Sequence, residues 1–178
     1  MNRIVTWLVS SDVSIFHYVN QQLKCRVLDY LLPKITHLGG ATATIGSLVI
    51  IITLFGTEIR SRAILALVSL AISHIFVHFI KKAYCRQRPY MRLTNVHLGS
   101  NPLKDYSFPS GHTTAAFSIA IMFALFSSLL AFILLPIAFL VGLSRMYLGL
   151  HYPTDCIIGA LLGTVSSIFV VFSYSFFF

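Results

Sequence analysis

The chain has 178 residues, of which 57% are hydrophobic and only 10% are charged. Soluble domains carry about 25% charged residues. A soluble fold of this length could not bury so much apolar surface, so the composition excludes an ordinary soluble protein and indicates a protein of the lipid bilayer. The 13 Lys and Arg residues exceed the 5 Asp and Glu residues and give a net charge of +8. This excess favours an anionic ligand or anionic lipid headgroups as partners.

Residues 1–38 mix apolar and polar positions. Apolar side chains such as Trp7 recur at spacings near three or four, with charged residues such as Asp12 between them. This period predicts one or two amphipathic helices on the membrane surface, and the charges argue against a membrane crossing. The length fits one domain, residues 1–178, in which interfacial helices precede a transmembrane core over residues 39–178.

The rest of the chain predicts about five transmembrane helices separated by polar breaks. They are expected at Ala41–Phe55, at Ala63–Ile80, twice within Thr113–Leu150, and at Cys156–Phe178. Thr57–Arg62 is expected to form a charged loop, and a tight turn is expected near Ser127–Ser128. Pro153 favours the first turn of the last helix, because a residue there needs no N–H partner. The predicted fold class is therefore all-α, a polytopic membrane helical bundle.

Three polar clusters interrupt the apolar segments. They are residues 81–89, Pro109–His112 and Ser144–Asp155. With five crossings, the loops that follow the second and fourth helices lie on the same membrane face as the N-terminal segment. All three clusters lie in or beside those two loops, so the predicted topology gathers them at one face.

The residue types in these clusters suit hydrolysis of a phosphate ester. That reaction needs an anion-binding pocket, neutralisation of the phosphoryl charge, an aligned nucleophile and a proton for the leaving oxygen. Lys81, Arg88 and Arg145 supply three cations, and each arginine can contact a pair of phosphate oxygens. Pro109–His112, with the sequence PSGH, precedes a predicted helix whose N-terminal amides form a further anion site.

Two histidines and one acid complete this set. His151 and Asp155 are four residues apart at a predicted junction between a loop and a helix. Asp155 can accept a hydrogen bond from one imidazole nitrogen and leave the other free as a nucleophile. His112 is then the acid that protonates the departing oxygen, and it can serve as the base in a second step.

The clusters contain three ordered motifs: K-x6-RP at Lys81–Pro89, PSGH at Pro109–His112 and SR-x5-H-x3-D at Ser144–Asp155. Together they resemble the complete signature of the type-2 phosphatidic acid phosphatase (PAP2) superfamily, over residues from Gly39 to the C-terminus. The resemblance implies a helical membrane phosphatase without a metal or other cofactor. It implies that His151 forms a phosphohistidine oriented by Asp155, with His112 as the proton donor. The implied phosphate-binding residues are Lys81, Arg88, Ser110, Gly111 and Arg145. Family members commonly have six spans, one more than is expected here.

The resemblance suggests a membrane lipid phosphate as the substrate, and first of all undecaprenyl diphosphate, hydrolysed to undecaprenyl phosphate and phosphate. Phosphatidylglycerol phosphate and phosphatidic acid are the alternatives. The expected partners are this lipid and the bilayer, without nucleic acid, and the sequence indicates no oligomeric state. Two other classes of function remain open. Vanadate-dependent haloperoxidases share the oxyanion pocket but are typically soluble, and a lipid-phosphate binding or transport protein would need the cations but not two histidines with an orienting acid.

Several other polar residues are assigned no catalytic role. His74 and His78 are spaced as metal ligands often are, but we expect them to pack inside the bundle because no third ligand is evident. Contacts with solvent or lipid headgroups are expected for Lys82, Arg86, Arg92 and Lys104. The three cysteines are odd in number and widely spaced, which argues against a disulfide framework or a zinc site.

The charge distribution and the family resemblance disagree about which side of the membrane carries the site. Apart from the phosphate-binding residues, eight Lys and Arg residues lie on the face with the motifs, against Arg60 and Arg62 on the other face. The positive-inside rule would place the motifs in the cytoplasm. The resemblance implies an outward-facing site, and we follow it. The expectation is a multi-pass protein of the bacterial plasma membrane with its active site on the extracytoplasmic face.

Overall fold

The computed structural model describes residues 3–177, which form helices joined by loops, with no strand among them. In chain order the helices are α1 (Arg3–His17), the π-helical turn η1 (Tyr18–Gln22), α2 (Arg26–Ile35), the 3-10 turn η2 (Thr36–Gly39), α3 (Ala41–Leu54), α4 (Thr57–Tyr84), α5 (Pro89–Arg92), α6 (Gly111–Ala124), α7 (Ser128–Tyr147) and α8 (Pro153–Phe177). The predicted all-α fold is confirmed.

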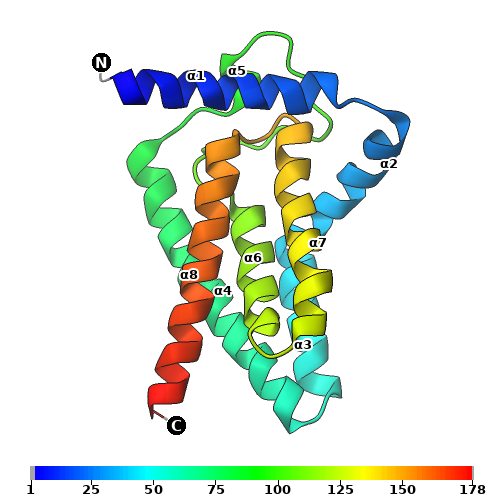
Figure 1. The fold of residues 1–178 in the computed structure, drawn as a ribbon, viewed down its shortest axis with the longest axis vertical. Coiled ribbons are helices and arrows are strands. Elements are labelled where there is room, and N and C mark those ends of the chain that lie inside the picture. The colour runs from blue at the N-terminus through cyan, green and yellow to red at the C-terminus, as the bar shows by residue number, and fades with distance from the viewer. Residues whose placement is uncertain (1–2, 178) are drawn as a thin grey trace.

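The helix α6 forms the centre of the bundle (Figure 1). It packs most extensively against α8 and α7, and it also packs against α4. The apolar core between the helices includes the fully buried side chains of Leu48, Ala66 and Met122. Glycine brings α8 close to α6, because a Cβ atom on Gly159 would lie only 2.7 Å from the carbonyl oxygen of Ser110. This close contact fixes the start of α8 against the start of α6, where two of the motifs lie.

Several helices are apolar enough to cross a membrane. Thr57–Arg92, Ser128–Tyr147 and Pro153–Phe176 are also long enough individually, and α2 with α3, which are bent by 59° at their junction, would make a fourth span. The helix α6 is apolar but has only 14 residues, fewer than the ~20 of a full crossing. All five expected apolar helices are therefore present, and the chain is a multi-pass membrane protein, although α3 and α6 are shorter than a full span.

Two parts of the chain differ from expectation. Thr57–Arg62, expected as a loop, forms the first turns of α4, which begins directly after Gly56. Glu58 is favoured in this first turn by the helix dipole, and the charged residues of this segment all lie at the end of the helix. The helix α2, expected on the membrane surface, instead leads into α3 as the bent pair. The turn before Ser128 and the place of Pro153 at the start of α8 are as predicted.

The helix α1 lies across one end of the bundle, over the ends of α7 and α8 (Figure 1). Its outer face exposes apolar side chains such as Trp7, which is 66% exposed, whereas Asp12 is only 3% exposed. This arrangement matches the amphipathic surface helix predicted for the start of the chain. The N-terminal helix therefore covers the end of the bundle at which the motif residues gather.

Candidate active site

The three polar clusters meet at the end of the bundle that α1 covers. A cavity of about 380 Å³ at this end is lined by residues from all three clusters. Its polar lining residues are His74, His78, Lys81, Arg88, Asp105, His112, Arg145 and His151, and Gly111 also lines it. The two imidazoles that the motifs predict to act together, those of His112 and His151, therefore face one cavity.

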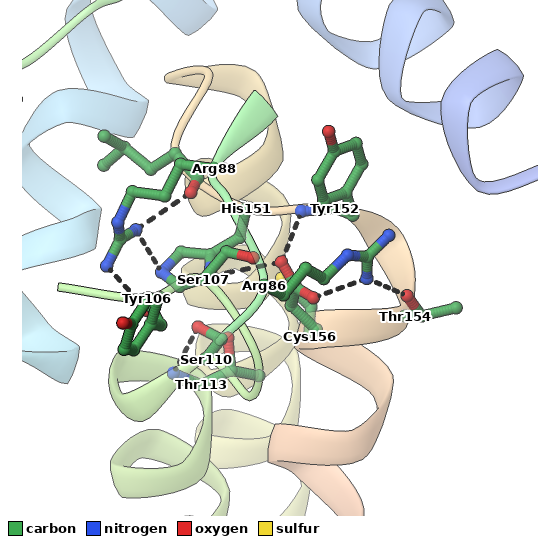
Figure 2. A network of polar contacts seen from close by, with 12 residues as sticks. Arg86, Arg88, Tyr106, Ser107, Ser110, Thr113, His151, Tyr152, Thr154 and Cys156 are labelled. Atoms are coloured by element: carbon green, nitrogen blue, oxygen red, sulfur yellow. Dashed lines mark hydrogen bonds and ion pairs between the residues drawn. The ribbon is translucent and has the colours of Figure 1, made fainter. Parts of the chain in front are cut away.

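The start of α6 forms one wall of the cavity. Ser110 caps this helix, because its hydroxyl accepts a hydrogen bond from the Thr113 amide at 3.4 Å and lies 2.9 Å from the Thr113 hydroxyl (Figure 2). The Ser110 amide donates to the Asp155 carbonyl oxygen at 3.0 Å and so joins α6 to α8. Neither Ser110 nor Asp155 is among the described residues that line the cavity, so Gly111 and His112 present the PSGH motif to it. The amides of the first turn favour an anion at this wall.

Arg145 is a buried cation with two unpaired donors. Its side chain is 3% exposed, and its Nη1 donates to the hydroxyl of Thr36 at 2.8 Å. Its Nε and Nη2 are buried and have no hydrogen-bond partner among residues 3–177. A buried donor without a partner costs about 1–3 kcal/mol, and more when it is charged. Because Arg145 lines the cavity, these donors indicate a position for an anion.

His151 lies in the loop between α7 and α8 and is 2% exposed. Its Nε2 accepts a hydrogen bond from Nη1 of Arg88 at 3.0 Å (Figure 2), which places the imidazole proton on Nδ1. Nδ1 lies 3.5 Å from Oδ2 of Asp155, and the same oxygen accepts a hydrogen bond from the Tyr152 amide at 2.8 Å. Burial, followed by the charges of Arg145 and Arg88, lowers the pKa of His151 well below its usual range. The imidazole is therefore neutral at neutral pH, with its lone pair on Nε2.

Asp105 pairs with two of the predicted phosphate-binding cations. Its carboxylate forms ion pairs with Lys81 and, at 2.6 Å, with Arg88. Partial burial alone would raise the pKa of Asp105, but the two ion pairs outweigh it and lower this pKa to about 2. The ionised carboxylate thus contacts both cations as a phosphate oxygen would. Asp105 was not predicted as a site residue. The available signal was its place just before PSGH, in a chain with only 5 acidic residues.

Arg86, which was predicted to contact solvent or headgroups, lies instead behind His151. Its Nη1 donates to Oγ1 of Thr154 at 2.7 Å (Figure 2) and to Oδ1 of Asp155, also at 2.7 Å. Its Nη2 donates to Oδ2 of Asp12 at 2.5 Å. The prediction is wrong because the fold brings α1, which carries Asp12, over the start of α8. The sequence around Arg86 does not indicate that its side chain contacts Asp12 and Asp155.

The prediction that His74 and His78 pack inside the bundle is also wrong, because both line the cavity. They lie one turn apart near the end of α4, on the side of this helix that forms the cavity wall. Nδ1 of His74 lies 2.9 Å from the carbonyl oxygen of Leu70, which fixes the ring. Among residues 3–177, no group of three His, Cys, Asp or Glu side chains is arranged to hold a metal ion.

Comparison with known families decides where the chain belongs. The model of the PAP2 superfamily matches residues 62–177. The chain belongs to the PAP2 superfamily. The PAP2 match contains all eight predicted site residues together with Arg86 and Asp105, whereas Asp12 lies before it.

Curated PAP2 relatives come from bacteria and archaea. The chain is 36% identical over 114 residues to the bacitracin transport permease protein BcrC of Bacillus licheniformis, which covers 64% of this chain and 56% of that protein. It is 31% identical over 150 residues to the undecaprenyl-diphosphatase BcrC of Bacillus subtilis, which covers 84% of this chain and 76% of that protein. The chain thus spans between about half and three quarters of the length of these relatives.

Two solved PAP2-like structures share the fold. Aquifex aeolicus LpxE is 28% identical, with a TM-score of 0.79 and coverage of 89% of this chain and 93% of that one. The first transmembrane PAP2 type phosphatidylglycerolphosphate phosphatase from Bacillus subtilis is 25% identical, with a TM-score of 0.80 and coverage of 99% of this chain and 89% of that one. The second likeness extends over nearly the whole chain, including the N-terminal helices that precede the family match.

Proposed function

We propose that this protein is a membrane lipid phosphatase that hydrolyses a phosphate or diphosphate headgroup through a phosphohistidine intermediate. The observation that carries the proposal is the pair of buried, unpaired donors on Arg145 in a cavity that the imidazoles of His112 and His151 also face. A protein that only binds a lipid phosphate would need the cations. The neutral imidazole of His151, backed by Asp155, adds a nucleophile to them.

The reaction has two steps. In the first, Nε2 of His151 attacks phosphorus, an N–P bond forms, and the bond from phosphorus to the leaving oxygen breaks while His112 gives that oxygen a proton. In the second, His112 takes a proton from a water molecule whose oxygen attacks phosphorus. The N–P bond then breaks, which releases orthophosphate and restores neutral His151. With a diphosphate lipid, the leaving group of the first step is the lipid monophosphate.

The surrounding groups prepare His151 for this attack. Asp155 keeps the proton on Nδ1 and stabilises the positive charge that the ring gains when Nε2 bonds to phosphorus. Arg88 now donates to Nε2, so substrate binding must transfer this donor to a phosphate oxygen. Together with Lys81 and Arg145, it then neutralises the charge on the phosphoryl oxygens, and removing one such donor typically costs ~10²–10³-fold in rate.

An apolar groove beside the polar cavity supports a lipid substrate. The groove has a volume of about 420 Å³ and lies between α3, α4 and α6. Ile45, Leu70 and Ala71 are among its apolar lining residues, and it shares His74 and His112 with the polar cavity. A headgroup in the polar cavity can therefore continue into an acyl or isoprenoid chain in the groove.

A bulky side chain in the groove should weaken binding of the lipid chain without slowing the hydrolysis step. Because Ala71→Phe places a ring in the groove, we expect KM for a long-chain lipid phosphate to rise by about 10-fold. Hydrolysis of a short-chain, water-soluble phosphate should change by less than about twofold, because the polar cavity is untouched. The matched control is Ile75→Phe, on an α4 position that is 55% exposed. An equal loss for both substrates in Ala71→Phe would contradict this use of the groove.

Undecaprenyl diphosphate is the substrate we propose, because the Bacillus subtilis relative is named as an undecaprenyl-diphosphatase. The alternative is phosphatidylglycerol phosphate, the headgroup named for the similar Bacillus subtilis structure, or phosphatidic acid. The test is phosphate release by the purified protein from each of these lipids in detergent, with a chelator present. We expect the diphosphate lipid to react fastest. Tight binding of all three without release would overturn the phosphatase and favour a binding protein.

We also propose that residues 1–178 act as one domain in the bacterial plasma membrane, with the cavity on the extracytoplasmic face. A single cysteine, Ser100→Cys, reports the location of the loop that leads into PSGH. It is introduced after the exposed Cys25 and Cys85 are replaced by serine. An impermeant maleimide should label it from outside intact cells. Labelling only after the cells are opened would place the cavity in the cytoplasm, as the charge count implies.

Asp105→Asn should strengthen inhibition by the product. The carboxylate now contacts Lys81 and Arg88, so it competes with orthophosphate for both cations. Loss of a partly exposed competing ion pair, worth about 1 kcal/mol, corresponds to a roughly fivefold lower inhibition constant. Phosphate inhibition of hydrolysis measures this, with Asp29→Asn as a control at an acid that pairs with Lys24 instead. Weaker inhibition in Asp105→Asn would show that the carboxylate holds the cations in place for the phosphate.

A further inference from the structure

Arg86 joins two buried acids from distant parts of the chain. Asp12 on α1 is 3% exposed, and Asp155 at the start of α8 is 0% exposed. The guanidinium donates to Oδ1 of Asp155 at 2.7 Å and to Oδ2 of Asp12 at 2.5 Å, and it stacks on the ring of Tyr152 at 4.0 Å. Figure 2 shows Arg86 reaching Thr154, beside Tyr152. With an acid on either side and a ring beneath it, the guanidinium has one well-defined position.

Asp12 is anchored to α8 independently of Arg86. Its Oδ1 accepts a hydrogen bond from the Thr154 amide at 2.8 Å, and its Oδ2 accepts one from the Thr154 hydroxyl at 2.7 Å. The amide belongs to the first turn of α8, where a carboxylate is favoured by the free N–H groups and the helix dipole. The helix α1 is thus attached next to Asp155 by two contacts that do not involve a cation.

The two carboxylate oxygens of Asp155 contact different partners. Oδ1 accepts from Arg86, while Oδ2 accepts from the Tyr152 amide at 2.8 Å and faces Nδ1 of His151 at 3.5 Å. The carboxylate cannot rotate without breaking one of these contacts. The geometry of the acid and the imidazole therefore depends on where Arg86 is held.

The net charge of the cluster formed by Asp12, Arg86 and Asp155 also affects the imidazole of His151. Two carboxylates and one guanidinium leave one negative charge, which is available to the imidazole as it becomes cationic. If Arg86 paired with Asp155 alone, that pair would be neutral and Asp155 would be a weaker acceptor. Without Arg86, two buried carboxylates would face each other and one of them would take up a proton. Arg86 thus favours the ionised form of Asp155, while Asp12 holds Arg86 in place and leaves the cluster with a net negative charge.

We propose that Arg86 and Asp12 are positioning residues for the reaction, with Arg86 directing the Asp155 carboxylate toward His151 and Asp12 of α1 directing Arg86. This inference rests on the proposed function, since it assumes that His151 is the nucleophile. It makes the surface helix α1 a part of the active site. Asp12 lies outside residues 62–177, the part of the chain that matches the family.

The test compares variants of the full-length protein with a lipid phosphate substrate. Asp12→Asn should lower kcat by about 10-fold, and Arg86→Gln by about 100-fold, the range typical for groups that orient a reacting residue. KM should stay within about twofold in both, because neither side chain touches the substrate. Arg86→Lys should restore part of kcat, because an ammonium supplies the charge but contacts the two acids less well.

A double variant tests whether the two residues act as one unit. In Asp12→Asn/Arg86→Gln we expect kcat no lower than in Arg86→Gln alone, because Asp12 acts through Arg86 and its removal relieves the excess negative charge. Thr154→Val removes one hydrogen bond to each of Arg86 and Asp12 without changing any charge, and it should lower kcat by about threefold or less. It serves as the mildest variant if the charge changes prevent folding.

The matched control is Asp29→Asn. Asp29 on α2 accepts a hydrogen bond from the Tyr147 hydroxyl at 2.7 Å, so it also ties an N-terminal helix to the bundle, and its side-chain partners are Tyr147 and Lys24 instead of Arg86 or His151. We expect its kcat to equal that of the wild type. The inference is overturned if Asp12→Asn and Arg86→Gln lower the melting temperature and leave kcat unchanged, or if they raise KM alone. If hydrolysis survives His151→Ala, the proposed mechanism fails instead, which separates the two results.

Discussion

His151→Ala is expected to abolish phosphate release, with a loss of at least about 10³-fold in kcat/KM. The physical reason is that Nε2 of His151 is the atom that bonds to phosphorus, and alanine offers no substitute for it. Its neutral state follows from burial and from two nearby guanidinium groups, which lower the pKa of His151. The variant should still bind orthophosphate, because the three cations remain.

The intermediate itself provides the decisive measurement. Wild-type protein quenched during turnover of a labelled lipid phosphate should carry label that is stable in base and lost in acid, as expected of a phosphohistidine. His151→Ala should carry none. His97→Ala, at an exposed histidine in the loop before PSGH, should retain both label and activity. Phosphate release that survives His151→Ala would exclude the covalent mechanism.

Arg145→Met is expected to lower kcat/KM by about 10²–10³-fold while leaving the protein at least as stable as the wild type. The loss follows from the Nε and Nη2 donors, which the described chain leaves unpaired. The unchanged or raised melting temperature follows from the same atoms, since a methionine of similar shape removes a buried charge whose hydrogen bonds are incomplete.

Arg145→Lys tests whether phosphate binding needs only the positive charge of Arg145 or also the planar shape of its guanidinium. An ammonium keeps the positive charge but lacks the planar set of donors that contacts two phosphate oxygens, so we expect it to recover only a small part of the activity. Arg92→Met is the control, at an exposed arginine on α5, and it should change kcat/KM by less than about twofold. A lower melting temperature in Arg145→Met with near-normal activity would assign Arg145 a structural role.

The motif residues could be found from the sequence because charged groups are rare in this chain. Lys81 and Arg145 lie at the ends of apolar segments, where a charge is costly and needs a function or a partner, and Arg88 lies in the polar loop that follows Lys81. The helices that carry Lys81 and Arg145 were predictable from the lengths of those segments. The loop expected at Thr57–Arg62 was wrong because a membrane helix continues past the hydrocarbon boundary whenever its next turn can reach the polar region.

The parts of the site that escaped prediction depend on contacts between remote residues. Arg86 and Asp12 are 74 positions apart, and nothing in either local sequence indicates that they meet. Asp105 is close to PSGH in sequence, but only the folded loop shows that it contacts Lys81 and Arg88. His74 and His78 have the spacing of a helix face, and that spacing is the same whether the face meets another helix or a cavity.

The pairing of Asp105 with Lys81 and Arg88 bears on how this protein can be made in a cell. Three like charges gathered at the edge of a bilayer repel one another, so a counter-ion favours closure of the bundle around them. Asp105 supplies that counter-ion from the same polypeptide. Assembly in the membrane can therefore be completed before any lipid phosphate arrives, and the unsatisfied donors of Arg145 are what the finished protein still offers to an incoming headgroup.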